Sequence, residues 1–179
     1  MARLIAFLRA INVGGHIVRM EELRRLFAEL GFTQVSTFIA SGNVVFSSRA
    51  KPDALAPRIE KQLRQALGYE VPTFLRTDAQ VAAIAAYRPF PPALSSRARI
   101  TYVGFLASDP GQPGRQALES LASPAEHLHL KGREVYWLTE TRLSESKLSY
   151  AAFEKALKTK ATFRGMNTVE RLAAWLNDD

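Results

Sequence analysis

The sequence of 179 residues contains no cysteine, which excludes disulfide bonds and thiolate chemistry. It also has no apolar run close to the roughly 18 residues that a membrane-spanning helix needs. The first apolar stretch, Leu4–Leu8, is too short for a signal peptide and is flanked by arginines on both sides. We therefore expect a soluble, cytoplasmic protein that makes no contact with a membrane.

Several motifs that carry well-known chemistry are missing. The chain has no phosphate-binding G-x-x-x-x-G-K-[ST] or G-x-G-x-x-G loop, no G-x-S-x-G nucleophile elbow and no zinc-binding H-E-x-x-H. The segment Ser144-Glu145-Ser146-Lys147 matches the S-x-x-K spacing of penicillin-recognising enzymes, but the accompanying S-D-N and K-T-G motifs are absent. We interpret this segment as a serine helix cap followed by a solvated lysine. No catalytic residue is assigned, and whether the protein is an enzyme stays open.

Histidine is scarce, with three residues in the whole chain. His127 and His129 lie on one face of a predicted strand, because side chains alternate along a strand. A zinc site needs three or four ligands, and the third histidine, His16, belongs to the other half of the chain. With Leu128 and Leu130 facing the core, we expect both strand histidines to face solvent. The sequence predicts neither a metal site nor a cofactor.

The formal net charge is +7. The basic excess is +5 in residues 1–89 and +2 in residues 90–179. A basic balance favours polyanionic partners such as nucleic acid. No stretch, however, reaches the density of arginine and lysine that is typical of a nucleic-acid-binding tail.

The first half of the chain alternates between strand and helix patterns. Short apolar runs predict strands, and apolar residues spaced three and four apart predict helices. The order strand, helix, strand, strand, helix, strand is that of a split βαβ unit. The predicted strands are Leu4–Leu8, Val35–Ile39, Val44–Phe46 and Val71–Arg76, and the predicted helices are Met20–Leu30, Asp53–Leu67 and Ala79–Tyr87.

A proline-rich stretch separates the halves, since three of the four residues from Pro89 to Pro92 are prolines and disfavour both helix and central strand. We expect domains at residues 1–88 and 99–179 joined by a linker at 89–98. The second half predicts strands Ile100–Leu106, His127–Lys131, Glu134–Leu138 and Thr159–Phe163, helices from Arg115 to Leu121 and from Ser144 or Ser146 to Leu157, and a closing helix from Thr168. The predicted fold is α+β, two tandem ferredoxin-like (β-α-β-β-α-β) halves plus a C-terminal helix. No repeat of individual residues is detected, so the duplication is one of topology only.

Two loops rich in glycine and asparagine form the candidate site. In a ferredoxin-like sheet the first two strands run in the same direction, so the end of strand one and the hairpin after strand two share one edge. A structural role is the simpler interpretation, because glycine and asparagine accept the positive φ of tight turns. Glu21 and Glu22 also disfavour an anion at the start of the next helix. The ligand-binding hypothesis uses Arg9, Asn12, Gly14, Gly15, Ser41, Gly42, Asn43 and Lys147, with His16 nearby.

The same stretch carries a family resemblance. The patterns R-x-I-N-V-G-G, M-x-E-L-R-x-L-x-x-x-L-G-F and S-G-N-V-V-F resemble the bacterial family called domain of unknown function 1697. The similarity continues at Ser146-Lys147-Leu148 and, more loosely, at residues 162–168, where Phe163, Gly165 and Met166 depart from the family's T-T-R-N-W-N-T. The resemblance implies a fold of two α/β halves and implies no activity.

Three functions stay open at this stage. The first is binding of a small anionic ligand at the polar edge formed by the Asn12–Gly15 and Ser41–Asn43 turns. The second is an RNA-binding or other nucleic-acid-binding module, suggested by the basic charge and by aromatic residues in strands. The third is a homo-oligomeric interaction protein whose exposed sheet edges pair. The sequence does not distinguish a monomer from a homodimer.

Overall fold

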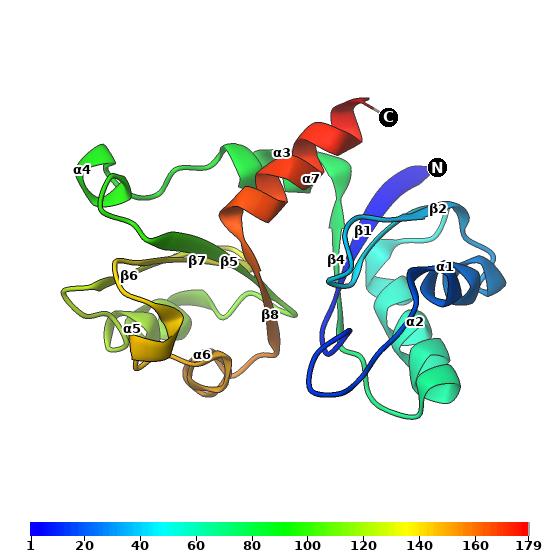
Figure 1. Cartoon of the computed structure of the whole chain (residues 1–179), viewed down its shortest axis with the longest axis horizontal. Coiled ribbons are helices and arrows are strands. Elements are labelled where there is room, and N and C mark those ends of the chain that lie inside the picture. The colour runs from blue at the N-terminus through cyan, green and yellow to red at the C-terminus, as the bar shows by residue number, and fades with distance from the viewer. Residues whose placement is uncertain (179) are drawn as a thin grey trace. The chain divides into compact units, whose positions relative to one another are not determined.

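The computed structural model describes residues 1–178 (Figure 1). Contacts divide the chain into two compact units, residues 1–81 and 82–179, which we call the N-terminal and C-terminal units. Each unit contains one four-stranded antiparallel sheet with flanking helices, and a helix closes the chain. The predicted α+β class with two halves and a C-terminal helix is confirmed. Among the described residues, no helix has the length and apolar character needed to cross a membrane.

The N-terminal unit has the strand order β2-β3-β1-β4, and every neighbouring pair is antiparallel. This is the arrangement that a β-α-β-β-α-β chain gives when strand three lies between strands one and two. The final helix, α3, crosses into the next unit. The elements are β1 (Ala2–Leu8), α1 (Met20–Glu29), β2 (Thr33–Thr37), β3 (Asn43–Ser48), α2 (Pro52–Leu67), β4 (Thr73–Thr77) and α3 (Asp78–Ala86).

Two amphipathic helices build the core of this unit. α1 and α2 lie on the same side of the sheet (Figure 1), and each presents a stripe of apolar residues at helical spacing. These stripes pack with the strand residues Leu4, Ala6, Leu8, Val44, Phe46 and Leu75 in one buried cluster. The helix residues of the cluster are Leu23, Leu26 and Phe27 from α1, and Leu55, Ile59 and Leu63 from α2.

The C-terminal unit repeats this topology with the strand order β6-β7-β5-β8. Its core is aromatic, with Trp137, Phe153 and Phe163 packed together in one buried cluster. The elements are α4 (Pro92–Ser95), β5 (Ile100–Leu106), α5 (Gly111–Glu119), β6 (Glu126–Lys131), β7 (Glu134–Thr139), the 3-10 turn η1 (Leu143–Glu145), α6 (Tyr150–Leu157), β8 (Ala161–Gly165) and α7 (Met166–Asp178). The short helix α4 lies inside the predicted linker and starts at Pro92, because proline is tolerated at the first position of a helix.

Three helix starts differ from the prediction. α5 begins at Gly111, four residues before the predicted Arg115, and α7 begins at Met166, two residues before the predicted Thr168. α6 begins at Tyr150, because the Ser149 hydroxyl caps it by accepting from the Ala152 amide at 3.1 Å. The predicted caps, Ser144 and Ser146, belong instead to η1 and to the extended residue that follows it.

Three strands are also shifted from their predicted positions. β4 covers Thr73–Thr77 rather than Val71–Arg76. β2 covers Thr33–Thr37 rather than Val35–Ile39, and the positive φ of Ile39 (50°) keeps that residue out of the strand. A second positive φ, at Gln34 (52°), lies inside the strand. Its pairing register with β3 shifts between Thr33 and Ser36, as at a β-bulge. The last strand, β8, covers Ala161–Gly165 rather than Thr159–Phe163, and it lies at a sheet edge as expected.

The duplication extends to individual residues, which corrects the prediction that it is one of topology only. Arg76 on β4 pairs with Ile5 of β1, and Arg164 on β8 pairs with Val103 of β5, so both arginines hold the same register position. Each donates from Nη1 to the carbonyl of the preceding residue, at 2.8 Å for Arg76 and 3.0 Å for Arg164. Each strand also runs directly into a helix, β4 into α3 and β8 into α7.

Candidate functional site

The two predicted loops lie against each other in the N-terminal unit. The Leu8 amide donates to the Gly42 carbonyl at 2.8 Å. The Asn12 side chain donates from Nδ2 to the Ala40 carbonyl at 2.8 Å. Main-chain and side-chain hydrogen bonds therefore connect the end of β1 and the loop after it to the β2–β3 hairpin.

Asn12 holds the first loop in shape. Its backbone has a φ of 56°, in the left-handed region that asparagine accepts better than most residues. Its Oδ1 accepts from the Val18 amide at 2.9 Å, while its Nδ2 donates across to the hairpin. Both the oxygen and the nitrogen of the side-chain amide are hydrogen-bonded within the protein. Asn12 therefore stabilises the loop.

Asn43 has a comparable role in the hairpin. Its side chain is completely buried, and its Nδ2 donates to the Phe38 carbonyl at 3.1 Å and to the Ser41 hydroxyl at 2.9 Å. Gly42 between them has a φ of 81° and is also buried. These three residues define the geometry of the turn.

The exposed part of the edge is the main chain from Val13 to Gly15. Gly14 and Gly15 have φ values of 59° and 85°, and a Cβ on either would meet no atom within 4 Å. The carbonyl of Val13 accepts from the His16 amide at 3.0 Å. The amides of Val13, Gly14 and Gly15 donate to no other group among residues 1–178. Three consecutive exposed amides are thus available for an acceptor from outside the chain.

An aromatic pair that the sequence did not predict lies beside this loop. The His16 ring stacks on Tyr69, with ring centroids 3.8 Å apart. Burial, with a smaller effect from Glu22, raises the pKa of Tyr69, so the phenol is neutral at physiological pH. The hydroxyl of Tyr69 is buried without a hydrogen-bond partner among the described residues. Only its position directly after Gly68, the end of α2, could have drawn attention to this tyrosine.

The two cationic residues of the predicted site, Arg9 and Lys147, belong to different units. Arg9 is half-buried at the end of β1, and its amide donates to the Pro72 carbonyl at 3.0 Å. Lys147 belongs to the C-terminal unit and is exposed between η1 and α6. Its neighbour Ser146 donates its hydroxyl hydrogen bond to Glu126, a buried carboxylate. The role of either cation in ligand binding stays a prediction.

The strand histidines are half-buried rather than solvent-facing, which corrects the prediction. His129 Nε2 lies 2.9 Å from the hydroxyl of Tyr87. Its pKa is lowered by burial and by the neighbouring charges of Arg115 and Lys131. His127 Nε2 lies 3.3 Å from Glu140. Over residues 1–178, no group of three or more potential ligands is placed to hold a metal ion.

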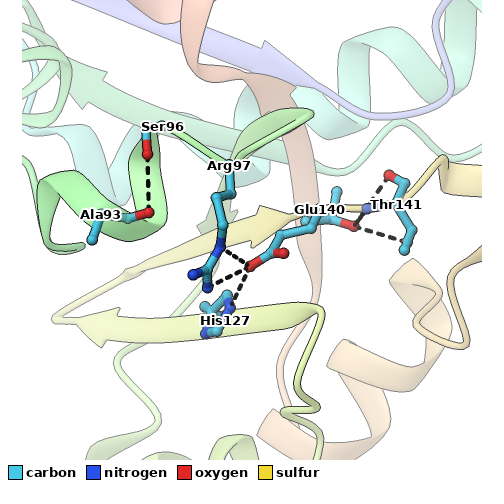
Figure 2. Close-up of polar contacts among 7 residues, drawn as sticks. Ala93, Ser96, Arg97, His127, Glu140 and Thr141 are labelled. Atoms are coloured by element: carbon cyan, nitrogen blue, oxygen red, sulfur yellow. Dashed lines mark hydrogen bonds and ion pairs between the residues drawn. The ribbon is translucent and has the colours of Figure 1, made fainter.

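Glu140 joins three segments of the C-terminal unit. Its Oε1 accepts from Nε and Nη2 of Arg97, at 3.2 and 3.1 Å, and lies next to the ring of His127. Figure 2 shows Arg97 and His127 meeting at this carboxylate. Arg97 follows α4, so the cluster ties the segment after α4 to the β6–β7 hairpin.

Replacing Glu140 with glutamine is expected to lower the thermal unfolding midpoint near pH 7 and to have little effect near pH 3. Hydrogen bonding to Arg97 lowers the pKa of Glu140. A carboxylate with a lowered folded-state pKa stabilises the protein above its unfolded pKa, and this contribution is lost as the pH falls through the folded value. Calorimetric scans across this range measure the effect. Glu119→Gln removes an equal charge from an exposed position and is the control. An equal loss at every pH would contradict the prediction.

These features define a class of protein, a duplicated α+β fold with a tight glycine-asparagine edge and, in the described part of the chain, no metal-binding cluster. The chain belongs to the family of proteins of unknown function called DUF1697, whose family model matches residues 1–136. The resemblance noted at Ser146–Leu148 and at residues 162–168 lies beyond the matched segment.

Similarity to a solved structure extends over both units. A conserved bacterial protein, SP0830 from Streptococcus pneumoniae, is 26% identical to this chain, with a TM-score of 0.74 and coverage of 99% of both chains. A search of curated proteins found no match. Neither the family description nor the structural relative assigns a ligand or a reaction.

Proposed function

We propose that the protein binds a small anionic ligand at the main-chain amides of Val13, Gly14 and Gly15. The observation that carries this proposal is the run of three exposed, unpartnered amides. Successive amides in a loop that alternates between left-handed and ordinary φ form a concave anion site of the kind called a nest. Positive φ values at Ala10, Asn12, Gly14 and Gly15 give the loop this character.

The loop is preorganised for such a role. The hydrogen bonds of Asn12 to Val18 and Ala40 fix it before any ligand arrives, so little ordering entropy is lost on binding. The approach to the loop is open, because Val13, Gly14 and Gly15 are exposed and a Cβ on either glycine would meet no atom within 4 Å. A fixed and open set of donors is what recognition of a carboxylate or phosphate oxygen requires.

The charged residues around the loop limit which anions can bind there. Glu21 and Glu22 occupy the first turn of α1 and offset its positive end. Amides rather than the helix dipole therefore hold the anion, and a singly charged group suits them better than a dianion. We include Arg9, which belongs to the same unit, as a further contact and the cytoplasm as the location in this proposal.

The RNA-binding alternative has less support. Sheets that read RNA present paired aromatics to stack on bases. Phe7 and Phe46 are buried, and Phe38 is half-buried. Self-association has one favourable observation, the exposed apolar side chains of Val13, Ile17 and Ile39. It is the second candidate, and the mass in solution tests it.

The main test is a titration followed by amide NMR. Phosphate and acetate are added at constant ionic strength, and we expect saturable shifts at the amides of Val13, Gly14 and Gly15. Gly15→Asp should weaken binding at least tenfold, about 1.4 kcal/mol, because it places a carboxylate beside the donors. Aspartate tolerates left-handed backbone, so the loop is retained.

Gly31→Asp is the matched control. Gly31 has a φ of 83°, against 85° for Gly15, and neither has an atom within 4 Å of a Cβ. Both variants carry the same backbone strain and the same added charge, but Gly31 lies after α1 and away from the three amides. Equal losses of affinity, or shifts that avoid residues 13–15, would overturn the proposal.

A further inference from the structure

The C-terminal unit contains a cleft of about 500 Å³. It lies between the segment after α3, the start of β5 and the junction of β8 with α7. This volume is in the range of sites that hold small organic molecules. None of its lining residues belongs to the edge described above, so the cleft is a separate feature.

One wall of the cleft is apolar and firmly held. Phe90, Ile100 and Met166 contribute apolar surface, and Ile100 is 37% exposed. Tyr87 continues this wall. Its hydroxyl is hydrogen-bonded to His129 at 2.9 Å, and the Lys131 ammonium lies 3.9 Å from its ring centroid. These contacts fix the tyrosine ring, so the wall does not depend on a ligand for its shape.

One of the charged side chains that line the cleft forms no ion pair with the described residues. Two arginines and one glutamate line it. Arg88 forms an ion pair with Glu170 at 2.6 Å and also donates to the Ala85 carbonyl at 2.7 Å. Arg99 is exposed, and its guanidinium has no hydrogen bond or ion pair with residues 1–178. The net charge of +1 therefore resides on a guanidinium that is free to bind.

The backbone at the start of α7 also favours an anionic ligand in the cleft. α7 begins at the cleft with Met166 and has no acidic residue in its first turn. The equivalent helix of the other unit, α3, is capped by the Thr77 hydroxyl and the Asp78 carboxylate. The corresponding positions before and at the start of α7 hold Gly165 and Met166, which have no side-chain acceptor oxygen. The uncapped first turn of α7 therefore favours an anion beside Arg99.

We propose that this cleft binds a small monocarboxylate with an apolar, preferably aromatic, body. Arg99 holds the carboxylate, because a guanidinium fork matches two carboxylate oxygens, and the body lies on Phe90 and Ile100. A single free positive charge favours a monoanion over a phosphate dianion. The inference goes beyond the proposed function, since it assigns a second site that uses side chains in the other unit.

Phenylacetate is the probe, measured by calorimetric titration and by amide shifts at Arg99, Ile100 and Gly165. We expect saturable binding that weakens at least tenfold in Arg99→Gln and less in Arg99→Lys, which keeps the charge but loses the fork. Benzyl alcohol, which lacks the charge, and inorganic phosphate, which lacks the body, should each bind at least tenfold more weakly than phenylacetate.

Lys155→Gln is the matched control. It removes the same charge from an exposed position on α6 in the same unit, and its affinity should stay within twofold of the wild type. Circular dichroism establishes that both variants are folded. Unchanged affinity in Arg99→Gln, equal losses in both variants, or no phenylacetate binding at millimolar concentration would overturn this inference. The Gly15→Asp titration reports on the other site, so the failure of one proposal is distinguishable from that of the other.

Discussion

Replacement of Trp137 with alanine is expected to lower the free energy of unfolding of the C-terminal unit by about 3–5 kcal/mol. Trp137 is completely buried. Its ring packs with Tyr102, Phe153 and Phe163, at centroid distances of 4.8, 5.2 and 6.2 Å. Truncation removes the largest fully buried side chain of the protein from the middle of this cluster, and the resulting cavity cannot be refilled without moving several aromatic rings.

The indole also supports a buried charge. Its Nε1 donates to Glu126 Oε2 at 2.9 Å, and the other oxygen of Glu126 accepts from the Ser146 hydroxyl. Trp137→Phe keeps most of the packing but removes this donor, so we expect a smaller loss of about 1–3 kcal/mol. The pair of variants separates the packing contribution from that of the hydrogen bond.

Urea unfolding followed by fluorescence measures both effects. The chain has two tryptophans, Trp137 and Trp175, and both belong to the C-terminal unit. Trp175 remains in either variant and reports the unfolding of that unit. A loss below about 2 kcal/mol in Trp137→Ala would show that the surrounding rings close the cavity, contrary to the expected cost of a truncated core residue.

Replacement of Gly42 with alanine is the second substitution with a large expected effect, about 2–5 kcal/mol. The φ of 81° imposes left-handed strain of about 1–2 kcal/mol on any residue with a Cβ. The new Cβ would also lie 3.0 Å from Ile11 Cβ and 3.2 Å from both Leu8 Cβ and the Leu8 carbonyl oxygen. Overpacking of this kind adds about 1–3 kcal/mol.

Gly68→Ala separates these two contributions. Gly68 has the same φ of 81°, but a Cβ there would meet no atom within 4 Å. It should therefore show the strain without the clash, a loss of about 1–2 kcal/mol. Urea unfolding gives both values, and the amide signal of Leu8, which donates to Gly42, reports whether the edge is distorted. Equal losses in the two variants would mean that the edge relaxes around the methyl group and is less rigid than its contacts indicate.

Helix α1 shows what periodicity alone can predict. Leu23, Leu26 and Phe27 fall on one face at helical spacing, and all three are buried. The strand pattern at Ile100–Leu106 was equally sufficient, and its predicted bounds are the observed ones. The signal in both segments is local, because the alternation of apolar and polar residues is set by which face the element buries.

The start of α6 shows where local reasoning fails. Ser144, Ser146 and Ser149 are equivalent as caps when judged by residue type. The Ser146 hydroxyl is held by its donation to Glu126, twenty residues earlier in the chain, and accepts from the Leu148 amide at 3.0 Å, so it caps the loop before α6 and not the helix itself. Only the folded unit brings that carboxylate to the loop, so the choice of Ser149 depends on a long-range contact.

The candidate sites divide in the same way. Glycine and asparagine identities predicted tight turns at the edge, because few other residues accept the required backbone angles. The sequence did not determine which acceptors Asn12 and Asn43 use, nor that the three amides of residues 13–15 have no partner. Hydrogen-bond partners depend on distances between segments that are remote along the chain.

The sequence by itself determined the class of fold, the order of its elements and the positions of its turns, since each follows from residue preferences within a short window. The equivalence of Arg76 and Arg164 needed the strand register. The cleft beside Arg99 needed residues 87–101 and 165–170 to be placed together. Only the tertiary structure decided these features, because packing between distant segments determines which polar groups are paired and which stay free for a ligand.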